Sequence, residues 1–187
     1  INGSNSLQPG VSAIALETLG RELWVFGRNG IEVYYNAGTT GFVYARQDGA
    51  TIDAGLHSAN AIARMDGTLY FVATDEDGRI RVVRVNGYQL EPVSTASVDK
   101  LINERHELAN HSCDAFSYSY SGHSFLVLRF RSYEPTVTAD FALCFDGQTG
   151  HWFTLSYRND AGQDVAYDGM SQALRSGYTL LGSAVSG

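Results

Sequence analysis

A short strand core of aromatic and branched apolar residues recurs four times along the chain, each time after a charged or glycine-bearing turn. The cores begin at residues 23, 69, 125 and 178 and read LWVF, LYFV, FLVL and YTLL. Their spacing is close to the period of roughly 40 to 50 residues that propeller blades show. The repeat therefore predicts an all-β, β-propeller-like fold, an architecture that hosts many unrelated functions.

Each repeat predicts one four-stranded antiparallel sheet, because apolar segments of strand length alternate with turn sequences such as Asn29-Gly30 and Asn86-Gly87. The strands expected in the first sheet are 12–19, 22–28, 31–36 and 42–47. Those expected in the second are 59–65, 69–74, 79–85 and 88–93. The third sheet should hold 115–120, 124–131, 139–145 and 151–157, and a fourth opens with 171–174 and 178–182.

These units divide the chain into about three blades and a partial one. Val98, Leu101 and Ile102 follow a helical spacing, which predicts one short helix over 98–104 that starts near Ser97. The expected blades are 11–55, 56–105, 106–169 and the partial 170–187, after a loop or linker at 1–10. The sequence starts with Ile1 and stops soon after an apolar strand, and we expect it to be a fragment of a longer protein.

Charge and cysteine content exclude several classes of protein. The 13 Lys and Arg residues against 20 Asp and Glu residues give a net charge of −7, which argues against tight DNA binding. No run of 18 apolar residues occurs, so we expect no membrane-spanning helix. Cys113 and Cys144 lie far apart with no metal-ligand spacing, and we expect reduced, buried thiols rather than a disulfide.

Motifs for metal binding or catalysis are incomplete in this sequence. The segment 75–78 reads DEDG, like the start of an EF-hand loop, but Arg79 and Arg81 stand where oxygen ligands should follow. It is therefore interpreted as a solvated acidic hairpin tip. None of the five histidines pairs with another at zinc-site spacing. They are His57, His106, His111, His123 and His151.

Carboxylates and aromatic residues give two weaker signals. Asp53, Asp99 and Asp114 lie near strand ends, as the acidic residues of propeller glycosidases do, but the aspartate-box repeat of sialidases is absent. The aromatic residues favour core or cross-strand packing over a ligand-stacking or partner surface. They are Tyr118, Tyr120, Tyr133, Tyr157, Trp152 and Phe153. The sequence thus predicts no catalytic residue, no metal site and no cofactor, and it leaves binding residues unassigned.

The order of strand and turn sequences resembles that of a known family. The matching segments are 22–27, 30–34, 67–72, 78–84, 87–95, 114–118, 122–128, 141–146 and 150–152. Together they resemble the packaged-DNA stabilisation family, the tail-hub proteins of short-tailed bacteriophages, over about 11–182. Whole members of that family are much longer, so the chain would correspond to their middle blades.

The resemblance implies a structural virion protein without enzymatic activity. Such a protein forms a ring of several copies beneath the portal, closes the DNA channel after packaging and helps to seat the needle and tailspikes. It implies the portal and other tail proteins as partners, at most weak contact with packaged DNA, no membrane, and a place in the virion tail after assembly in the host cytoplasm.

Two other functions stay open from the residues alone. A carbohydrate-binding, lectin-like propeller would use aromatic rings such as Trp24, Trp152 and Tyr157 to line sugar sites. A glycosidase of the same fold is less favoured. Open sheet edges in a fragment would promote self-association or domain exchange.

Overall fold

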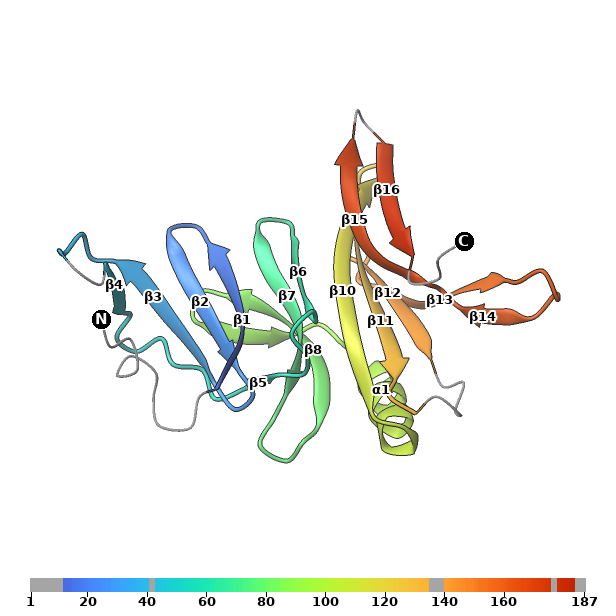
Figure 1. Cartoon of the computed structure of the whole chain (residues 1–187), viewed down its shortest axis with the longest axis horizontal. Helices are drawn as coiled ribbons and strands as arrows, with labels where there is room; N and C mark the ends of the chain where they lie inside the picture. The colour runs from blue at the N-terminus through green and yellow to red at the C-terminus, as the bar shows by residue number, and fades with distance from the viewer. Residues whose placement is uncertain (1–11, 41–42, 135–139, 176–177, 184–187) are drawn as a thin grey trace.

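The computed structural model describes residues 12–40, 43–134, 140–175 and 178–183. Almost every element in it is a β-strand, and every strand pair is antiparallel. The sheets stand side by side in chain order, like consecutive blades (Figure 1). This arrangement is the β-propeller-like fold that the repeat predicts.

The first three sheets share a four-stranded core, and the second and third each carry one extra strand. The first sheet contains β1 (Ala13–Leu19), β2 (Glu22–Gly27), β3 (Ile31–Asn36) and β4 (Tyr44–Arg46). The second contains β5 (Gly55–Leu56), β6 (Ile62–Met65), β7 (Thr68–Thr74), β8 (Ile80–Asn86) and β9 (Gln89–Pro92). The third contains β10 (His111–Tyr120), β11 (His123–Ser132), β12 (Phe141–Asp146), β13 (Trp152–Arg158) and β14 (Asp164–Ala166). A two-stranded sheet follows, made of β15 (Gly169–Arg175) and β16 (Tyr178–Ser183).

Most predicted strands are confirmed, and the differences have local causes. The third sheet begins at His111 rather than at 115, because the first four residues of β10 pair with the end of β11. The short strands β5 and β14 were not predicted, since two or three residues carry no readable alternation. The expected linker at 1–10 and the first residues of the strands at 42 and 139 lie outside the described residues.

The one helix is longer than predicted. Helix α1 (Ala96–Leu108) begins after Thr95, whose hydroxyl oxygen accepts a hydrogen bond from the Val98 amide at 3.4 Å. A threonine N-cap of this kind satisfies an amide that has no partner within the helix. The apolar spacing identified the buried face, Val98 and Ile102, but not the polar last turns. No helix among the described residues is long and apolar enough to cross a membrane.

Tight turns with positive φ connect the inner hairpins. Asp66 and Gly67, between β6 and β7, have φ angles of 51° and 78°. Ser121 and Gly122, between β10 and β11, have φ angles of 50° and 83°. Two consecutive left-handed residues match the right-handed twist of the flanking strands, which fixes the register of each hairpin. The predicted acidic tip at 75–78 lies in a longer connection, between β7 and β8, in which only Gly78 has a positive φ, and its last three residues are exposed.

One continuous apolar core runs through the first three sheets. Phe26 of the first sheet meets Phe71 of the second edge to face, with ring centroids 5.2 Å apart. On the other side of the second sheet, Tyr70 faces Phe145 of the third at 6.4 Å. These contacts belong to a single buried cluster that also includes Trp24, Leu69, Leu126 and Leu143. Adjacent sheets therefore bury each other's faces.

The two cysteines are free and buried, as predicted, and they lie on opposite faces of the third sheet. Cys113 belongs to the main core, whereas Cys144 packs with Phe116 and Val127 in a second cluster. Burial raises the pKa of the Cys144 thiol to about 12, so it stays protonated.

Truncation of Phe71 should reveal how strongly the sheets depend on one another. We expect Phe71→Ala to lower the free energy of unfolding by about 3 to 5 kcal/mol, because it opens a cavity between two sheets. Denaturant unfolding followed by tryptophan fluorescence measures the change. Leu108→Ala, at an exposed helix position, is the control and should change stability by less than about 0.5 kcal/mol.

Candidate functional site

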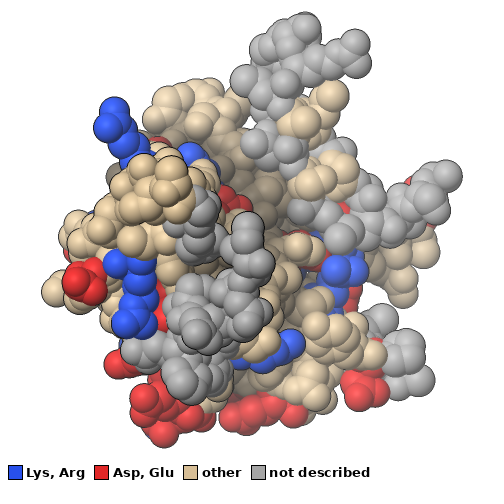
Figure 2. Space-filling view, turned by 60° about the vertical axis from the view of Figure 1, so that its left-hand side comes forward, with Lys and Arg blue, Asp and Glu red and all other residues tan. Residues whose placement is uncertain are grey.

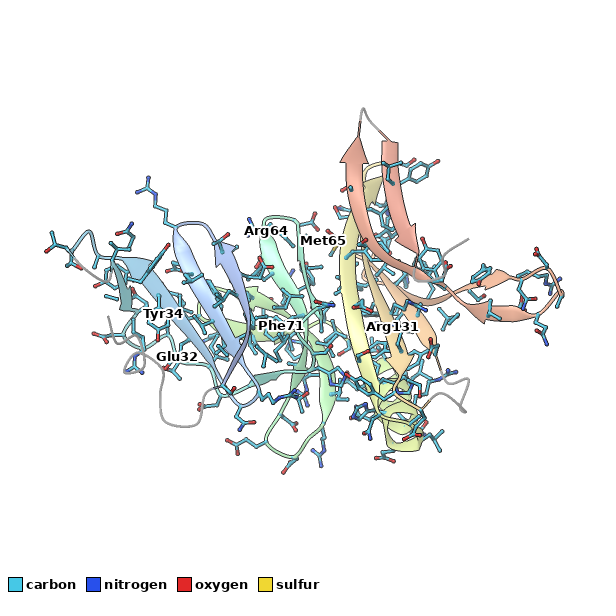
Figure 3. The ribbon with its side chains drawn as sticks, in the orientation of Figure 1. Glu32, Tyr34, Arg64, Met65, Phe71 and Arg131 are labelled. Atoms are coloured by element: carbon cyan, nitrogen blue, oxygen red, sulfur yellow. The ribbon has the colours of Figure 1, made fainter. Side chains whose placement is uncertain are left out.

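The innermost strands of successive sheets lie next to one another and form a wall. Strand β10 contacts both β6 of the second sheet and β15 of the last sheet. The Arg64 guanidinium on β6 donates to the backbone oxygen of Thr18 on β1 and lies 4.0 Å from the Glu17 carboxylate. The Ser117 hydroxyl on β10 donates to the Arg64 backbone oxygen. Through these contacts Arg64, labelled in Figure 3, connects strands of three sheets.

Three hydrogen bonds join segment 57–60, which lies between β5 and β6 of the second sheet, to the start of β10 in the third sheet. The Ser58 hydroxyl donates to the Cys113 carbonyl at 2.8 Å and accepts from the Cys113 amide at 2.9 Å. Two residues further on, the Ala115 amide donates to the Asn60 carbonyl at 2.8 Å. The segment 57–60 therefore runs parallel to the start of β10, and we call this junction the seam.

A buried carboxylate supports the seam from the side of β10. The side chain of Asp114 is 4% exposed. One of its oxygens accepts from the Asn60 amide at 3.0 Å, and the other accepts from the Arg131 Nε at 2.9 Å. A charge buried this deeply is stable only when it has such partners. Asp114 is thus held in place by both neighbouring segments.

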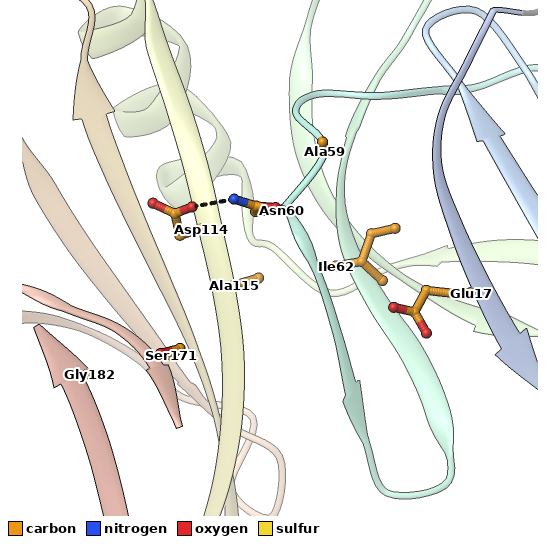
Figure 4. Close-up of a pocket in the computed structure, with 8 residues that line it drawn as sticks. All are labelled: Glu17, Ala59, Asn60, Ile62, Asp114, Ala115, Ser171 and Gly182. Atoms are coloured by element: carbon orange, nitrogen blue, oxygen red, sulfur yellow. Dashed lines mark hydrogen bonds between the residues drawn. The ribbon is translucent and has the colours of Figure 1, made fainter. Parts of the chain in front are cut away.

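The wall borders an open hollow of about 520 Å³ (Figure 4). The residues that line it come from β1, the seam, β6, β10 and the last sheet. They are Glu17, Ala59, Asn60, Ile62, Asp114, Ala115, Ser171 and Gly182. Both ionisable residues in this lining are acidic, and the rest are small, polar or aliphatic. Each of these carboxylates has a cationic partner, Arg64 for Glu17 and Arg131 for Asp114, so the described lining offers no unpaired cation that would bind phosphate.

Carboxylates also gather along one edge of the molecule. Figure 2 shows Asp and Glu side chains along the lower rim of the view, with Lys and Arg scattered elsewhere. One of the exposed acidic segments is the β7–β8 tip, where Asp75 accepts hydrogen bonds from the amides of Asp77 and Arg79. The Asp75 carboxylate is thus used to shape the turn. Among the described residues, no group of three or more His, Cys, Asp or Glu could hold a metal ion.

The aspartates considered for a glycosidase site are not brought together. Asp114 lies at the seam, Asp99 lies in the first turn of α1, and Asp53 lines a separate hollow beside Arg28 and Glu76. Glycosidases need two carboxyl groups on either side of one bond. These three positions do not provide such a pair.

Of the aromatic residues suggested for sugar stacking, one is fully buried and one is partly buried. Trp24 is fully buried in the core. Trp152 stacks near Phe145 at 5.0 Å and donates from its indole nitrogen to the Val93 carbonyl at 3.1 Å. Tyr157 alone of the three is exposed. The assignment of Trp24 to a sugar-binding surface is therefore wrong, whereas Trp152 is partly buried and joins the third sheet to Val93.

The remaining aromatic residues divide between packing and exposure. Tyr118 stacks on Phe125 with centroids 5.0 Å apart, and Phe153 meets the edge of the same ring. Tyr120 and Tyr133 are exposed. Packing between strands of the third sheet explains the positions of Tyr118 and Phe153, as the sequence predicts.

The environments of four histidines could not be predicted from the sequence. His57, His106 and His111 lie together although they belong to three different segments. His123 instead donates from Nδ1 to the Asp146 carboxylate at 2.9 Å, because an ionised carboxylate can only accept. Burial opposes ionisation of Asp146, but hydrogen bonds from Thr149, Gln148 and His123 outweigh it and lower its pKa to about 2. His151 lies at the exposed start of β13.

The wall residues themselves were also missed. Asn60 and Asp114 are 54 positions apart, and Arg64 and Thr18 are 46 apart. Nothing in the local sequence marks such pairs, because they meet only when whole sheets stack. The spacing of the repeat was the one available signal, since it places equivalent inner strands side by side.

Comparison with known proteins identifies one family. The family described as Bacteriophage P22 Gp10, β-propeller, matches residues 3–186, which is nearly the whole chain. No curated protein matches the sequence.

Removal of the buried carboxylate should test the wall. We expect Asp114→Ala to destabilise the fold by about 2 to 4 kcal/mol, because it leaves Asn60 and Arg131 without their shared partner. Thermal and urea unfolding provide the measurement. The control is Asp164→Ala, which removes an exposed ion pair with Arg158 and should cost less than about 1 kcal/mol. Equal losses in the two variants would contradict a supporting role for Asp114.

Proposed function

Since the chain belongs to the β-propeller family of phage P22 Gp10, a family of structural phage proteins, we propose that it forms part of a tail hub. In this role the protein attaches beneath the portal, helps to close the DNA channel after packaging and helps to seat the needle and tailspikes. The family membership carries the proposal, and the wall described above supports it. The role requires shape and contact surfaces rather than a catalytic residue.

The construction of the inner wall suits a protein that must withstand load. Its sheets are joined by packed aromatic rings and by the hydrogen bonds of Ser58 and Asn60 to β10 at the seam. Interiors of this kind are close-packed and resist deformation. A ring of several copies would then present a stiff inner surface, with the partner contacts on the outer strands and loops.

The acidic lining supports weak rather than tight contact with DNA. Glu17 and the buried Asp114 are the ionisable residues that line the hollow, and the whole chain carries a net charge of −7. Proteins that grip DNA neutralise phosphates with Lys and Arg and bind in a strongly salt-dependent manner. A channel component that binds phosphates only weakly would let DNA move past it during ejection.

Binding to the portal tests the proposed place in the virion. We expect the parent protein to form a defined ring complex with purified portal rings of its own phage, visible by size-exclusion chromatography with light scattering and by negative-stain imaging. Portal rings alone and the protein alone are the reference samples. Failure of the two to co-elute at micromolar concentrations would contradict the proposal.

A charge substitution tests the proposed relation to DNA. We expect the chain to bind a labelled DNA duplex with a dissociation constant weaker than about 10⁻⁴ M at physiological salt, by fluorescence anisotropy. Glu17→Lys should tighten binding, because it replaces an acidic wall residue with a cation. Glu107→Lys changes the charge equally on the exposed face of α1 and should have a smaller effect. Equal effects of the two substitutions would contradict a DNA-facing wall.

A further inference from the structure

Three histidines from three segments meet at the end of the seam. His57 follows β5, His106 lies in the last turn of α1, and His111 is the first residue of β10. The rings of His57 and His106 are 5.1 Å apart, and those of His106 and His111 are 6.3 Å apart. We call these residues the histidine cluster. It joins the second sheet, the helix and the third sheet at one point.

Hydrogen bonds within the cluster fix the protonation of two ring nitrogens, and one of them, at His106, requires a neutral imidazole. The His111 amide donates to Nδ1 of His106 at 3.2 Å, so that nitrogen must carry no proton. Nε2 of His57 lies 2.9 Å from the His111 carbonyl oxygen, which can only accept, so Nε2 carries the proton. Protonation of His106 at Nδ1 would replace an attractive contact with two opposed N–H groups.

The surroundings disfavour positive charge on the cluster. Arg28, from the turn between β2 and β3, and the two neighbouring histidines are the charged or titratable groups that act on His57. Arg105 of α1 lies over the Phe141 ring, which also contacts His111. Phe130 on β11 and Phe141 on β12 add apolar rings. The described groups that act on His57 are thus cationic or apolar. On the His111 side the described residues include one carboxylate, Asp140, which accepts from the amide of Ser132, the strand partner of His111, and pairs with Arg129.

The pKa values of His57 and His106 are also shifted toward the neutral form. Burial, together with the neighbouring His106, lowers the pKa of His57 from 6.5 to about 4, and burial also lowers the pKa of His106. When the cluster opens, each imidazole returns toward its ordinary pKa. The closed state is therefore fully favoured above about pH 6.5 and loses stability as the pH falls toward 4.

The cluster is continuous with the hydrogen bonds of the seam. His57 also donates its backbone amide to the Val72 carbonyl at 3.0 Å, and Ser58, the next residue, makes the two bonds to Cys113. A charge on the cluster would push apart the segments that these bonds hold together. Helix α1 would be affected as well, because His106 is one of its residues.

We propose that the histidine cluster is an acid-labile latch, which holds the second sheet and α1 against the third while its imidazoles are neutral and releases the seam when they are protonated. The released state has an open junction beside the inner hollow, whereas the apolar core between the sheets remains packed. The latch concerns the chain's own folding and is independent of the tail-hub role.

Hydrogen exchange at the seam tests the latch. Protection factors for the amides of Cys113 and Ala115, corrected for intrinsic exchange rates, are measured from pH 7 to pH 4.5. We expect seam opening to increase by about 60-fold between pH 7 and pH 4.5 from the titration of His57 alone. His57→Gln keeps an N–H donor for the His111 carbonyl but cannot titrate, so the increase should fall below about tenfold.

Two further variants make the result decisive. His106→Asn places a carbonyl oxygen near the position of Nδ1 and should also reduce the acid response. If His57→Gln fails to fold, His106→Asn provides the test of the latch instead. His151→Gln removes an exposed histidine far from the seam and should leave the response unchanged. The proposal is overturned if the seam opens equally with acid in the wild type and in a folded His57 or His106 variant.

Discussion

Face-to-face packing between successive sheets is the interaction on which the rest of the structure depends. A four-stranded sheet with two apolar faces cannot bury them alone, so each sheet needs a neighbour on either side. The Phe26–Phe71 and Tyr70–Phe145 contacts show this on the two faces of the second sheet. Once these faces are packed, the inner strands must lie side by side, and the seam and the hollow follow from that geometry.

Polar groups then give the junctions their specificity. The apolar core would tolerate small shifts between sheets, but the bonds of Ser58 to Cys113 and of Asn60 to Asp114 are possible at one alignment only. Gly55 adds a steric constraint, because a Cβ at that position would lie 1.6 Å from the Arg28 carbonyl oxygen. The hydrogen bonds at the seam, Gly55 and the Asp114 carboxylate thus fix the alignment of neighbouring sheets, which hydrophobic burial alone does not determine.

The sequence predicted the repeated sheets, most strand positions, the helix and the reduced cysteines, because these follow from local alternation, turn chemistry and residue type. It did not predict the short strands β5 and β14 or the first residues of β10, where the pairing partner decides the structure. Nor could it reveal the wall. Glu17, Asn60 and Arg64 have ordinary local surroundings, and only the stacking of sheets brings them together. Trp24 shows the converse, since its residue type suggested a surface role and its strand buries it.

The central claim is that the stacked sheets form a stiff inner wall within a phage tail hub. A cryo-electron microscopy reconstruction of the tail, from virions that contain the parent protein, tests it most directly. The account predicts sheet-rich density directly beneath the portal, with the edges of β1, β6 and β10 nearest to the channel axis. Density for this chain elsewhere in the virion, or with these edges facing away from the axis, would contradict it.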